Sequence, residues 1–151
     1  EEMLVAVQLA CQDADALLMA AAVADFRPVN PAGQKIKKES SVPQIQLENT
    51  PDILAEITHH RASTGFPRVS VGFAAESPAL RQNAQDKLKK KRLDMIVAND
   101  ISAQDAGFAV DDNRVTLLFP DGKSEDLPLM SKDQVAAIVL ERVTALLQNP
   151  R

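Results

Sequence analysis

The longest apolar run of the chain is Ala16-Leu-Leu-Met-Ala-Ala-Ala-Val-Ala24, and it lies between Asp15 and Asp25. A short, wholly apolar run that follows a helical pattern is typical of a strand buried on both faces of a parallel sheet. We therefore expect a buried strand that extends from Ala16 to Val23. Such a strand needs a neighbouring strand on each side.

The segment before this run has apolar residues at helical spacing over 1–12, but no capping residue precedes it. A helix at the start of an α/β pattern crosses over from an earlier strand. We therefore expect a fragment that lacks upstream βα units, or a chain whose missing part is disordered or separate.

Composition narrows the class of protein. The chain has 151 residues, 45% hydrophobic and 25% charged, which is typical of one ordinary globular domain and excludes a disordered chain. Nine apolar residues are too few for a membrane helix, which needs about 20. The formal net charge of −4 and the absence of Trp and Tyr argue against a nucleic-acid binder. The single cysteine, Cys11, excludes an internal disulfide, and with no signal-peptide pattern we expect a cytoplasmic protein.

Outward from the apolar run, predicted helices and strands alternate. Asn49 or Thr50 is a typical helix cap, and Pro51 then occupies the first helical position. In chain order we expect a helix over 1–12, the first strand, an irregular segment over 25–43, a short strand over 45–47, a helix from 51 to about 63, a strand over 69–73, a helix from 77 to about 92, a strand over 93–98, a β-hairpin over 114–129 that turns at Asp121-Gly122, and a helix after Ser131. This order predicts an α/β fold with an antiparallel appendage.

Polar residues follow three of the predicted strands, in Ala24-Asp-Phe-Arg27, Phe73-Ala-Ala-Glu76 and Asn99-Asp100. The carboxyl ends of parallel strands meet at one edge of a sheet, where ligands bind. The helix that starts at Pro51 adds free N–H groups that favour an anion. The alternative is that these Asp and Asn residues only cap turns.

A stripe of lysines follows in the helix over 77–92. At about 100° per residue, Lys87 and Lys91 fall within about 20° of Leu80, on the side expected to face the protein, whereas Lys89 points to solvent. Two buried ammonium groups are costly without anions, which favours phosphate binding. Alternatively, the lysine stems pass the edge of the core to reach water. The stripe is expected to lie away from the strand ends of its own subunit. Two alternatives therefore stay open, a site formed between subunits and a ligand that extends from the strand ends to the lysines.

A second basic cluster, Lys35-Ile-Lys-Lys38, lies in the predicted irregular segment. It is typical of a loop that closes over a ligand, or else of a solvated basic loop. The chain has no Walker or G-x-G-x-x-G motif, and His59-His60 lacks a partner at metal-ligand spacing. Without a nucleophile motif, we expect catalysis by positioning and charge neutralisation.

Six blocks of sequence, in order, closely resemble the bacterial phosphopantothenate–cysteine ligase. They are Ala20-Ala-Ala-Val-Ala-Asp-Phe-Arg-Pro28, Lys35-Ile-Lys-Lys38, Asn49-Thr-Pro-Asp-Ile-Leu54, Val71-Gly-Phe-Ala-Ala-Glu76, Lys87-Leu-Lys-Lys-Lys91 and Asp94-Met-Ile-Val-Ala-Asn-Asp100. The resemblance covers nearly all of 1–151 and implies one ligase domain. It also implies a Rossmann-like three-layer sandwich with a mainly parallel sheet, and a homodimer.

The resemblance implies a reaction in coenzyme A biosynthesis. The carboxylate of 4′-phosphopantothenate attacks the α-phosphate of CTP, which yields an acyl-cytidylate and pyrophosphate. The amine of L-cysteine then displaces CMP to form 4′-phosphopantothenoylcysteine. Mg²⁺ would neutralise the triphosphate, although the sequence identifies no metal ligands. The family domain is usually fused to a flavin-dependent phosphopantothenoylcysteine decarboxylase, and that half is absent here, so no FMN is expected.

The resemblance also implies residue roles. The Pro51–Leu54 turn and Asp25 would hold CTP, Phe73 would pack at the cytosine, and Lys87 and Lys91 would hold the phosphates. Lys35 would be catalytic in the second half-reaction. The full set of implied nucleotide-binding residues is Met19, Ala20, Ala21, Asp25, Lys35, Pro51, Asp52, Ile53, Leu54, Phe73, Lys87 and Lys91.

The family's N-terminal segment, with its glycine-rich strand–turn element, is absent from this sequence. Two alternatives therefore remain beside the CTP-dependent ligase. One is a nucleotide-binding or dimerisation fragment without turnover of its own. The other is a ligase of the eukaryotic type that uses ATP.

Overall fold

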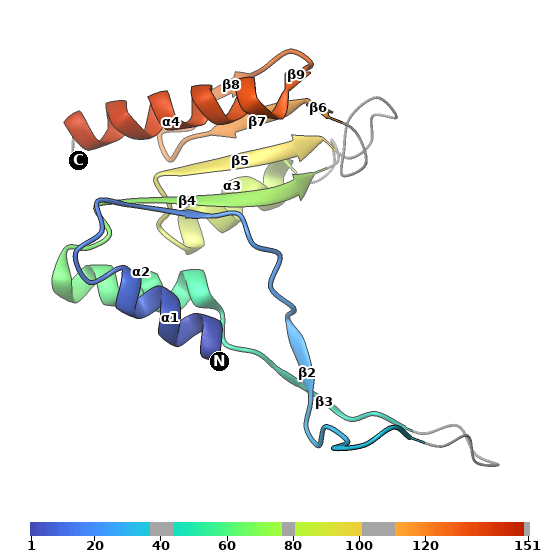
Figure 1. The fold of residues 1–151 in the computed structure, drawn as a ribbon. Coiled ribbons are helices and arrows are strands. Elements are labelled where there is room, and N and C mark those ends of the chain that lie inside the picture. The colour runs from blue at the N-terminus through green and yellow to red at the C-terminus, as the bar shows by residue number, and fades with distance from the viewer. Residues whose placement is uncertain (37–43, 77–80, 101–110, 150–151) are drawn as a thin grey trace.

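A five-stranded mixed sheet forms the centre of the computed structural model, which describes residues 1–36, 44–76, 81–100 and 111–149 (Figure 1). Its strand order is β1-β4-β5-β7-β8. Three neighbouring strands are parallel: β1 (Ala16–Met19), β4 (Val69–Glu76) and β5 (Met95–Asp100). Of the other two, β7 (Val115–Leu118) pairs antiparallel with β5, and β8 (Ser124–Asp126) pairs antiparallel with β7. The predicted C-terminal hairpin is thereby confirmed.

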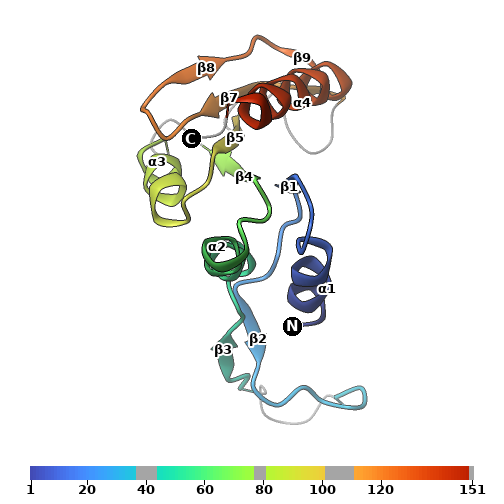
Figure 2. The ribbon, with the colours of Figure 1, turned by 90° about the vertical axis from the view of Figure 1, so that its left-hand side faces the viewer.

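Helices cover both faces of the sheet and make the predicted three-layer α/β sandwich (Figures 1 and 2). One face carries α2 (Ile53–Thr64) and α3 (Arg81–Lys90), with α1 (Glu2–Ala10) packed on α2. The other face carries α4 (Lys132–Gln148). Each face has its own apolar core, and a fully buried Leu or Ile in such a core stabilises the fold by about 1.5–3 kcal/mol.

The first strand is shorter and more exposed than predicted. β1 ends at Met19, opposite Gly72 of β4, and Ala20 to Ala24 is irregular and exposed. Among the described residues β1 is an edge strand, because β4 is its one neighbour. The prediction of a strand buried on both faces up to Val23 is therefore wrong. Hydrophobic composition alone did not reveal that the chain leaves the sheet after four residues.

An extended arm leaves the body after β1 (Figure 1). Within it, β2 (Phe26–Pro28) pairs antiparallel with β3 (Leu47–Asn49). The segment expected to be irregular therefore begins with a strand, and the strand expected over 45–47 lies two residues further on. Residues 37–43, which include Lys37 and Lys38, lie outside the described part.

The helix ends follow known capping chemistry, and the predicted start of the last helix after Ser131 is confirmed. Gly65 ends α2 in the left-handed conformation at φ 80°, and Ser131 forms a capping box with Gln134 at the start of α4. α2, however, begins at Ile53 with Asp52 as its N-cap, not with Asn49 or Thr50. The predicted start of α3 at Ser77 lies outside the described residues. β6 (Asp112–Asn113) and β9 (Met130–Ser131) form a separate small pair. Within the described ranges, every helix is too short or too polar to cross a membrane.

Candidate functional site

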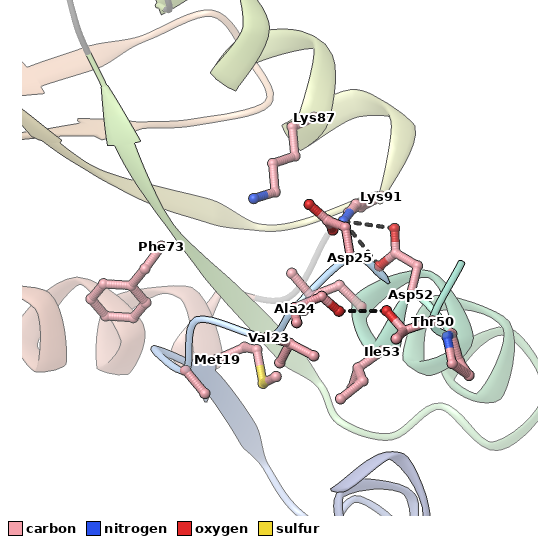
Figure 3. Close-up of a pocket in the computed structure, with 13 residues that line it drawn as sticks. Met19, Val23, Ala24, Asp25, Thr50, Asp52, Ile53, Phe73, Lys87 and Lys91 are labelled. Carbon is pink, nitrogen blue, oxygen red and sulfur yellow. Dashed lines mark hydrogen bonds and ion pairs between the residues drawn. The ribbon is translucent and has the colours of Figure 1, made fainter. Parts of the chain in front are cut away.

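A pocket of about 140 Å³ lies where the carboxyl end of β1, the middle of β4, the start of α2 and the end of α3 meet (Figure 3). Its size is below the roughly 300–1,000 Å³ typical of small-molecule sites, so it would enclose only part of a nucleotide. The lining residues are Met19, Ala21, Val23, Ala24, Asp25, Thr50, Pro51, Asp52, Ile53, Leu54, Phe73, Lys87 and Lys91.

Two hydrogen bonds from Thr50 close the base of the arm at this pocket. The Thr50 N–H donates to the carbonyl of Asp25 at 2.9 Å, and the Thr50 hydroxyl donates to the carbonyl of Ala24. The β2–β3 register continues this pairing, with Phe26 opposite Asn49. The segment that follows β1 is thereby fixed beside the start of α2.

The amino end of α2 supplies N–H groups that have no acceptor within the helix. The Asp52 side chain caps the helix by accepting the Ala55 N–H at 3.2 Å. The N–H groups of Ile53 and Leu54, the first two residues of α2, have no acceptor within the helix. Both residues line the pocket, where these groups and the positive end of the helix dipole favour an anion.

Lys87 and Lys91 face the protein as predicted, and both line the pocket. Lys87 and Lys91 are half-buried, whereas Lys89 is exposed. The expectation that the stripe lies away from the strand ends is wrong, because both lysines share the pocket with Met19 at the end of β1 and with Phe73 of β4. The reason is the early end of β1, which stops opposite Gly72, midway along β4, so that the end of this short strand shares a pocket with the end of α3.

Lys91 forms an ion pair with the N-cap of α2. Its Nζ lies 2.8 Å from Asp52 Oδ2 and 2.9 Å from Asp52 Oδ1, and its side chain is only 19% exposed (Figure 3). Burial would raise the pKa of the Asp52 carboxyl. The hydrogen bonds from Lys91 and Ala55 and the charges of Lys91 and Lys87 outweigh it, so the pKa of Asp52 lies below its ordinary value.

The structure brings ten of the twelve predicted nucleotide-binding residues into the pocket lining: Met19, Ala21, Asp25, Pro51, Asp52, Ile53, Leu54, Phe73, Lys87 and Lys91. Ala20 and Lys35 are exposed and do not line it. Lys35 lies on the arm, which extends away from the body (Figure 1). Phe73 lies apart from the lysines in Figure 3 and also packs on the core beneath α4.

Sequence reasoning missed Val23, Ala24 and Thr50 as lining residues. Val23 and Ala24 belong to the apolar run over 16–24, of which only the first four residues form β1. The apolar residues left over after the strand were the signal that could have placed them in the lining. Of the predicted strand-end residues, Asn99 does not line the pocket, and its Oδ1 is buried without a hydrogen-bond partner among the described residues.

Metal-ligand chemistry in the pocket is sparse. Across the described ranges, no three or more His, Cys, Asp or Glu side chains lie close enough to hold a metal ion by themselves. The pocket contains two carboxylates, Asp25 and Asp52, and Asp52 is paired with Lys91. Proteins usually bind Mg²⁺ through one or two carboxylates, with substrate phosphates and water as the other ligands. The two carboxylates of this pocket fit that mode of binding, which needs the substrate's phosphates.

Together, the fold and the pocket define an α/β domain with a mixed sheet and a pocket at the carboxyl end of β1, lined by two lysines and by the start of a helix. A family model described as the DNA/pantothenate metabolism flavoprotein C-terminal domain matches residues 1–147. The chain belongs to this family.

Named relatives support this assignment. The chain is 41% identical over 132 residues to the coenzyme A biosynthesis bifunctional protein CoaBC of Bacillus subtilis (strain 168), a match that covers 87% of this chain and 32% of that protein. It is 40% identical over 149 residues to the CoaBC protein of Vibrio parahaemolyticus, covering 97% of this chain and 36% of that protein. The chain thus spans about a third of the length of these relatives.

A solved structure has the same fold. The crystal structure of the C-terminal domain of a coenzyme A biosynthesis bifunctional protein CoaBC superposes with a TM-score of 0.75 at 35% identity. The match covers 97% of this chain and 64% of that chain. The Rossmann-like α/β fold expected from the resemblance is thereby confirmed.

The Asp52–Lys91 pair predicts a pH dependence of stability. The pKa of Asp52 is lowered from 3.8 in the folded chain, so the pair's contribution is complete above about pH 3.8 and is lost as the pH falls through the lower, folded value. Asp52→Asn keeps a good N-cap but removes the charge. Between about pH 6 and about pH 3, we expect the melting temperature of the original chain to fall a few degrees more than that of the variant. Equal losses in a thermal scan would contradict the pairing.

Proposed function

We propose that this domain takes part in coenzyme A biosynthesis as a CTP-dependent phosphopantothenate–cysteine ligase. The observation that carries the proposal is the pocket in which Lys87 and Lys91 face the open N–H groups at the start of α2. A site of this kind suits a polyphosphate. The relatives' names and the six sequence blocks supply the choice of reaction.

In the proposed complex the phosphates lie between the end of α3 and the start of α2. The N–H groups of Ile53 and Leu54 donate to phosphate oxygens, and Lys87 neutralises charge from the opposite side. Lys91 exchanges Asp52 for the phosphates, because its Nζ already lies beside the start of α2 at the pocket. The nucleoside extends along Met19, Ala20 and Ala21 towards Phe73. Stabilisation of charge that develops at the α-phosphate then activates the pantothenate carboxylate.

Mg²⁺ would enter with the triphosphate and offset part of its negative charge. Asp25 is exposed at the rim of the pocket and would supply one oxygen ligand, with phosphate oxygens and water supplying the others. Asp52, engaged by Lys91, is less suited to this role.

Lys35 is proposed to act in the second half-reaction, in which the cysteine amine displaces CMP. Lys35 lies on the arm and outside the pocket. It can therefore act only when the arm, either of the same chain or of a second copy, closes over the pocket. Its charge would then stabilise the developing negative charge of the displacement.

We propose that the arm also makes the homodimer. Five large apolar side chains along it are exposed: Phe26, Val29, Ile36, Ile45 and Leu47. Water-exposed apolar side chains gathered on one projecting element mark an interaction surface. A second copy would cover this surface by a closed two-fold contact. We further propose that the domain works in the cytoplasm and, in its full-length protein, beside a decarboxylase.

Nucleotide binding without turnover is the second candidate, favoured by the position of Lys35 outside the pocket. Calorimetry with CTP and Mg²⁺, run beside a coupled pyrophosphate assay with 4′-phosphopantothenate, separates the two. Binding with pyrophosphate release supports the ligase, and binding alone supports the second candidate. ATP in competition with CTP tests the eukaryotic-type alternative. No binding of either nucleotide would overturn the proposed function.

Removal of one pocket lysine is expected to weaken CTP binding selectively. Lys87→Gln removes a half-buried charge beside the pocket, so we expect the Kd for CTP to rise about tenfold or more. Lys91→Gln should act in the same direction. Lys89→Gln is the matched control, because Lys89 lies on the exposed side of the same helix. Equal effects of Lys87→Gln and Lys89→Gln in calorimetry would show that only general charge attraction is at work.

Lys35→Gln is expected to separate the two half-reactions. Pyrophosphate release without cysteine should proceed at a nearly unchanged rate, whereas formation of the amide should fall by about two orders of magnitude, as for the loss of one transition-state contact. Rapid quench with labelled 4′-phosphopantothenate distinguishes accumulated acyl-cytidylate from product. Normal amide formation by the variant would refute this role of Lys35.

The arm is expected to control the oligomeric state. Leu47→Glu places a charge on the apolar surface of β3, where the side chain is 58% exposed, and should shift the chain from dimer to monomer. Leu140→Glu on α4, where the side chain is 55% exposed, is the matched control and should leave the dimer intact. Light scattering after size-exclusion chromatography measures the mass. A monomeric original chain, or a dimer that survives Leu47→Glu, would count against the arm as interface.

A further inference from the structure

Helix α2 holds Lys91 at two points. At the side-chain end, Lys91 Nζ pairs with Asp52, the N-cap of α2. At the backbone end, the Thr58 hydroxyl, on the second turn of α2, donates to the carbonyl of Lys91 at 2.7 Å. Thr58 does not line the pocket. It therefore contacts the site through the backbone of Lys91.

The end of α3 has the geometry of a Schellman motif. The Leu93 N–H donates to the Leu88 carbonyl at 3.0 Å, and the Arg92 N–H donates to the Lys89 carbonyl at 3.2 Å. Arg92 occupies the left-handed position at φ 46°, where glycine is usual. Leu88 and Leu93 are buried in the same core, as the motif requires. These two bonds satisfy the carbonyls of Leu88 and Lys89, and the Thr58 hydroxyl supplies a donor to the carbonyl of Lys91.

The Thr58 hydroxyl has one hydrogen and two acceptors within reach. The Leu54 carbonyl lies at 2.9 Å, four residues back on α2, which is the ordinary local bond of a helical threonine. The Lys91 carbonyl lies closer, at 2.7 Å, and joins residues 33 apart in sequence. The bond to Leu54 lies within α2 and would form in any helix. The bond to Lys91 is therefore the tertiary contact, because it joins α2 to the end of α3.

We propose that Thr58 is a positioning residue for Lys91: it fixes the backbone at the end of α3 so that the Lys91 ammonium reaches the pocket. This inference rests on the proposed function, in which the pocket takes a nucleoside triphosphate. Lys91 must then exchange Asp52 for phosphate oxygens, and only its side chain can move if the backbone stays in place. A lysine stem has four rotatable bonds, so an anchored backbone limits the entropy that is lost when phosphate binds.

A double-mutant cycle on CTP affinity tests the proposal. Thr58→Val keeps the shape of the side chain and removes the hydroxyl. We expect it to raise the Kd for CTP about fivefold, the effect of one hydrogen bond, and Thr58→Ser to restore the affinity to within about twofold. In the Lys91→Gln background Thr58→Val should have no further effect, because Thr58 acts through Lys91.

A threonine on α4 provides the matched control. The Thr144 hydroxyl donates to the Leu140 carbonyl four residues back, as Thr58 does to Leu54, but on a helix away from the pocket. Thr144→Val should leave the Kd for CTP unchanged. An equal loss of affinity from Thr58→Val with and without Lys91, or no loss at all in a chain that binds CTP, would overturn the proposal. If Thr58→Val does not fold, the Thr58→Ser and Thr58→Ala variants complete the same cycle.

A ligand-free measurement separates failure of this inference from failure of the proposed function. Acylation of lysines by an amine-reactive ester, followed by mass spectrometry, compares Lys91 with the exposed Lys89 in the same molecule. Thr58→Val should raise the rate of Lys91 relative to Lys89 at least about twofold, because the paired ammonium is released. An unchanged ratio would overturn the positioning role even if CTP binds. A raised ratio in a chain that ignores CTP would refute the proposed function alone.

Discussion

The meeting of the amino end of α2 with the carboxyl end of α3 is the constraint on which the site depends. At this point Asp52 both caps α2 and pairs with Lys91, the residue that follows α3. These two helices on one face of the sheet thus bring positive groups together, because N–H groups come from the start of one helix and lysines from the end of the other. The pair balances charge in the free pocket and leaves a lysine within reach of an incoming anion. The lowered pKa of the Asp52 carboxyl favours its ionised, paired form.

The arm adds the second constraint. Its base is fixed to the body by Thr50, which holds the chain at Ala24 and Asp25, while its outer part carries exposed apolar side chains. The same hairpin therefore shapes one wall of the pocket and presents a surface that suits a second copy of the chain. In the proposed dimer the arm would link assembly to the site, because it carries both the exposed apolar side chains and Lys35.

Much of the site was predictable because it depends on patterns of residues that are close together in the sequence. The spacing of Lys87 and Lys91 follows the helical period, and capping chemistry placed the start of a helix close to Pro51, two residues before the observed start of α2 at Ile53. Asn49 and Thr50 were the wrong caps because the same residue types also serve strands and turns, and here they lie at the end of β3 or bond across to Ala24. The early end of β1, the β2–β3 pairing and the reach of Lys91 to Asp52 depend on contacts between distant residues, which no local pattern encodes.

The central claim is that this pocket holds the triphosphate of CTP. A crystal structure of the chain with CTP and Mg²⁺ tests it most directly. The account predicts phosphate density between Lys87, Lys91 and the N–H groups of Ile53 and Leu54, with the Lys91 ammonium moved from Asp52 to a phosphate oxygen. Nucleotide bound elsewhere on the chain, with the Asp52–Lys91 pair intact and the pocket filled only by water, would contradict it.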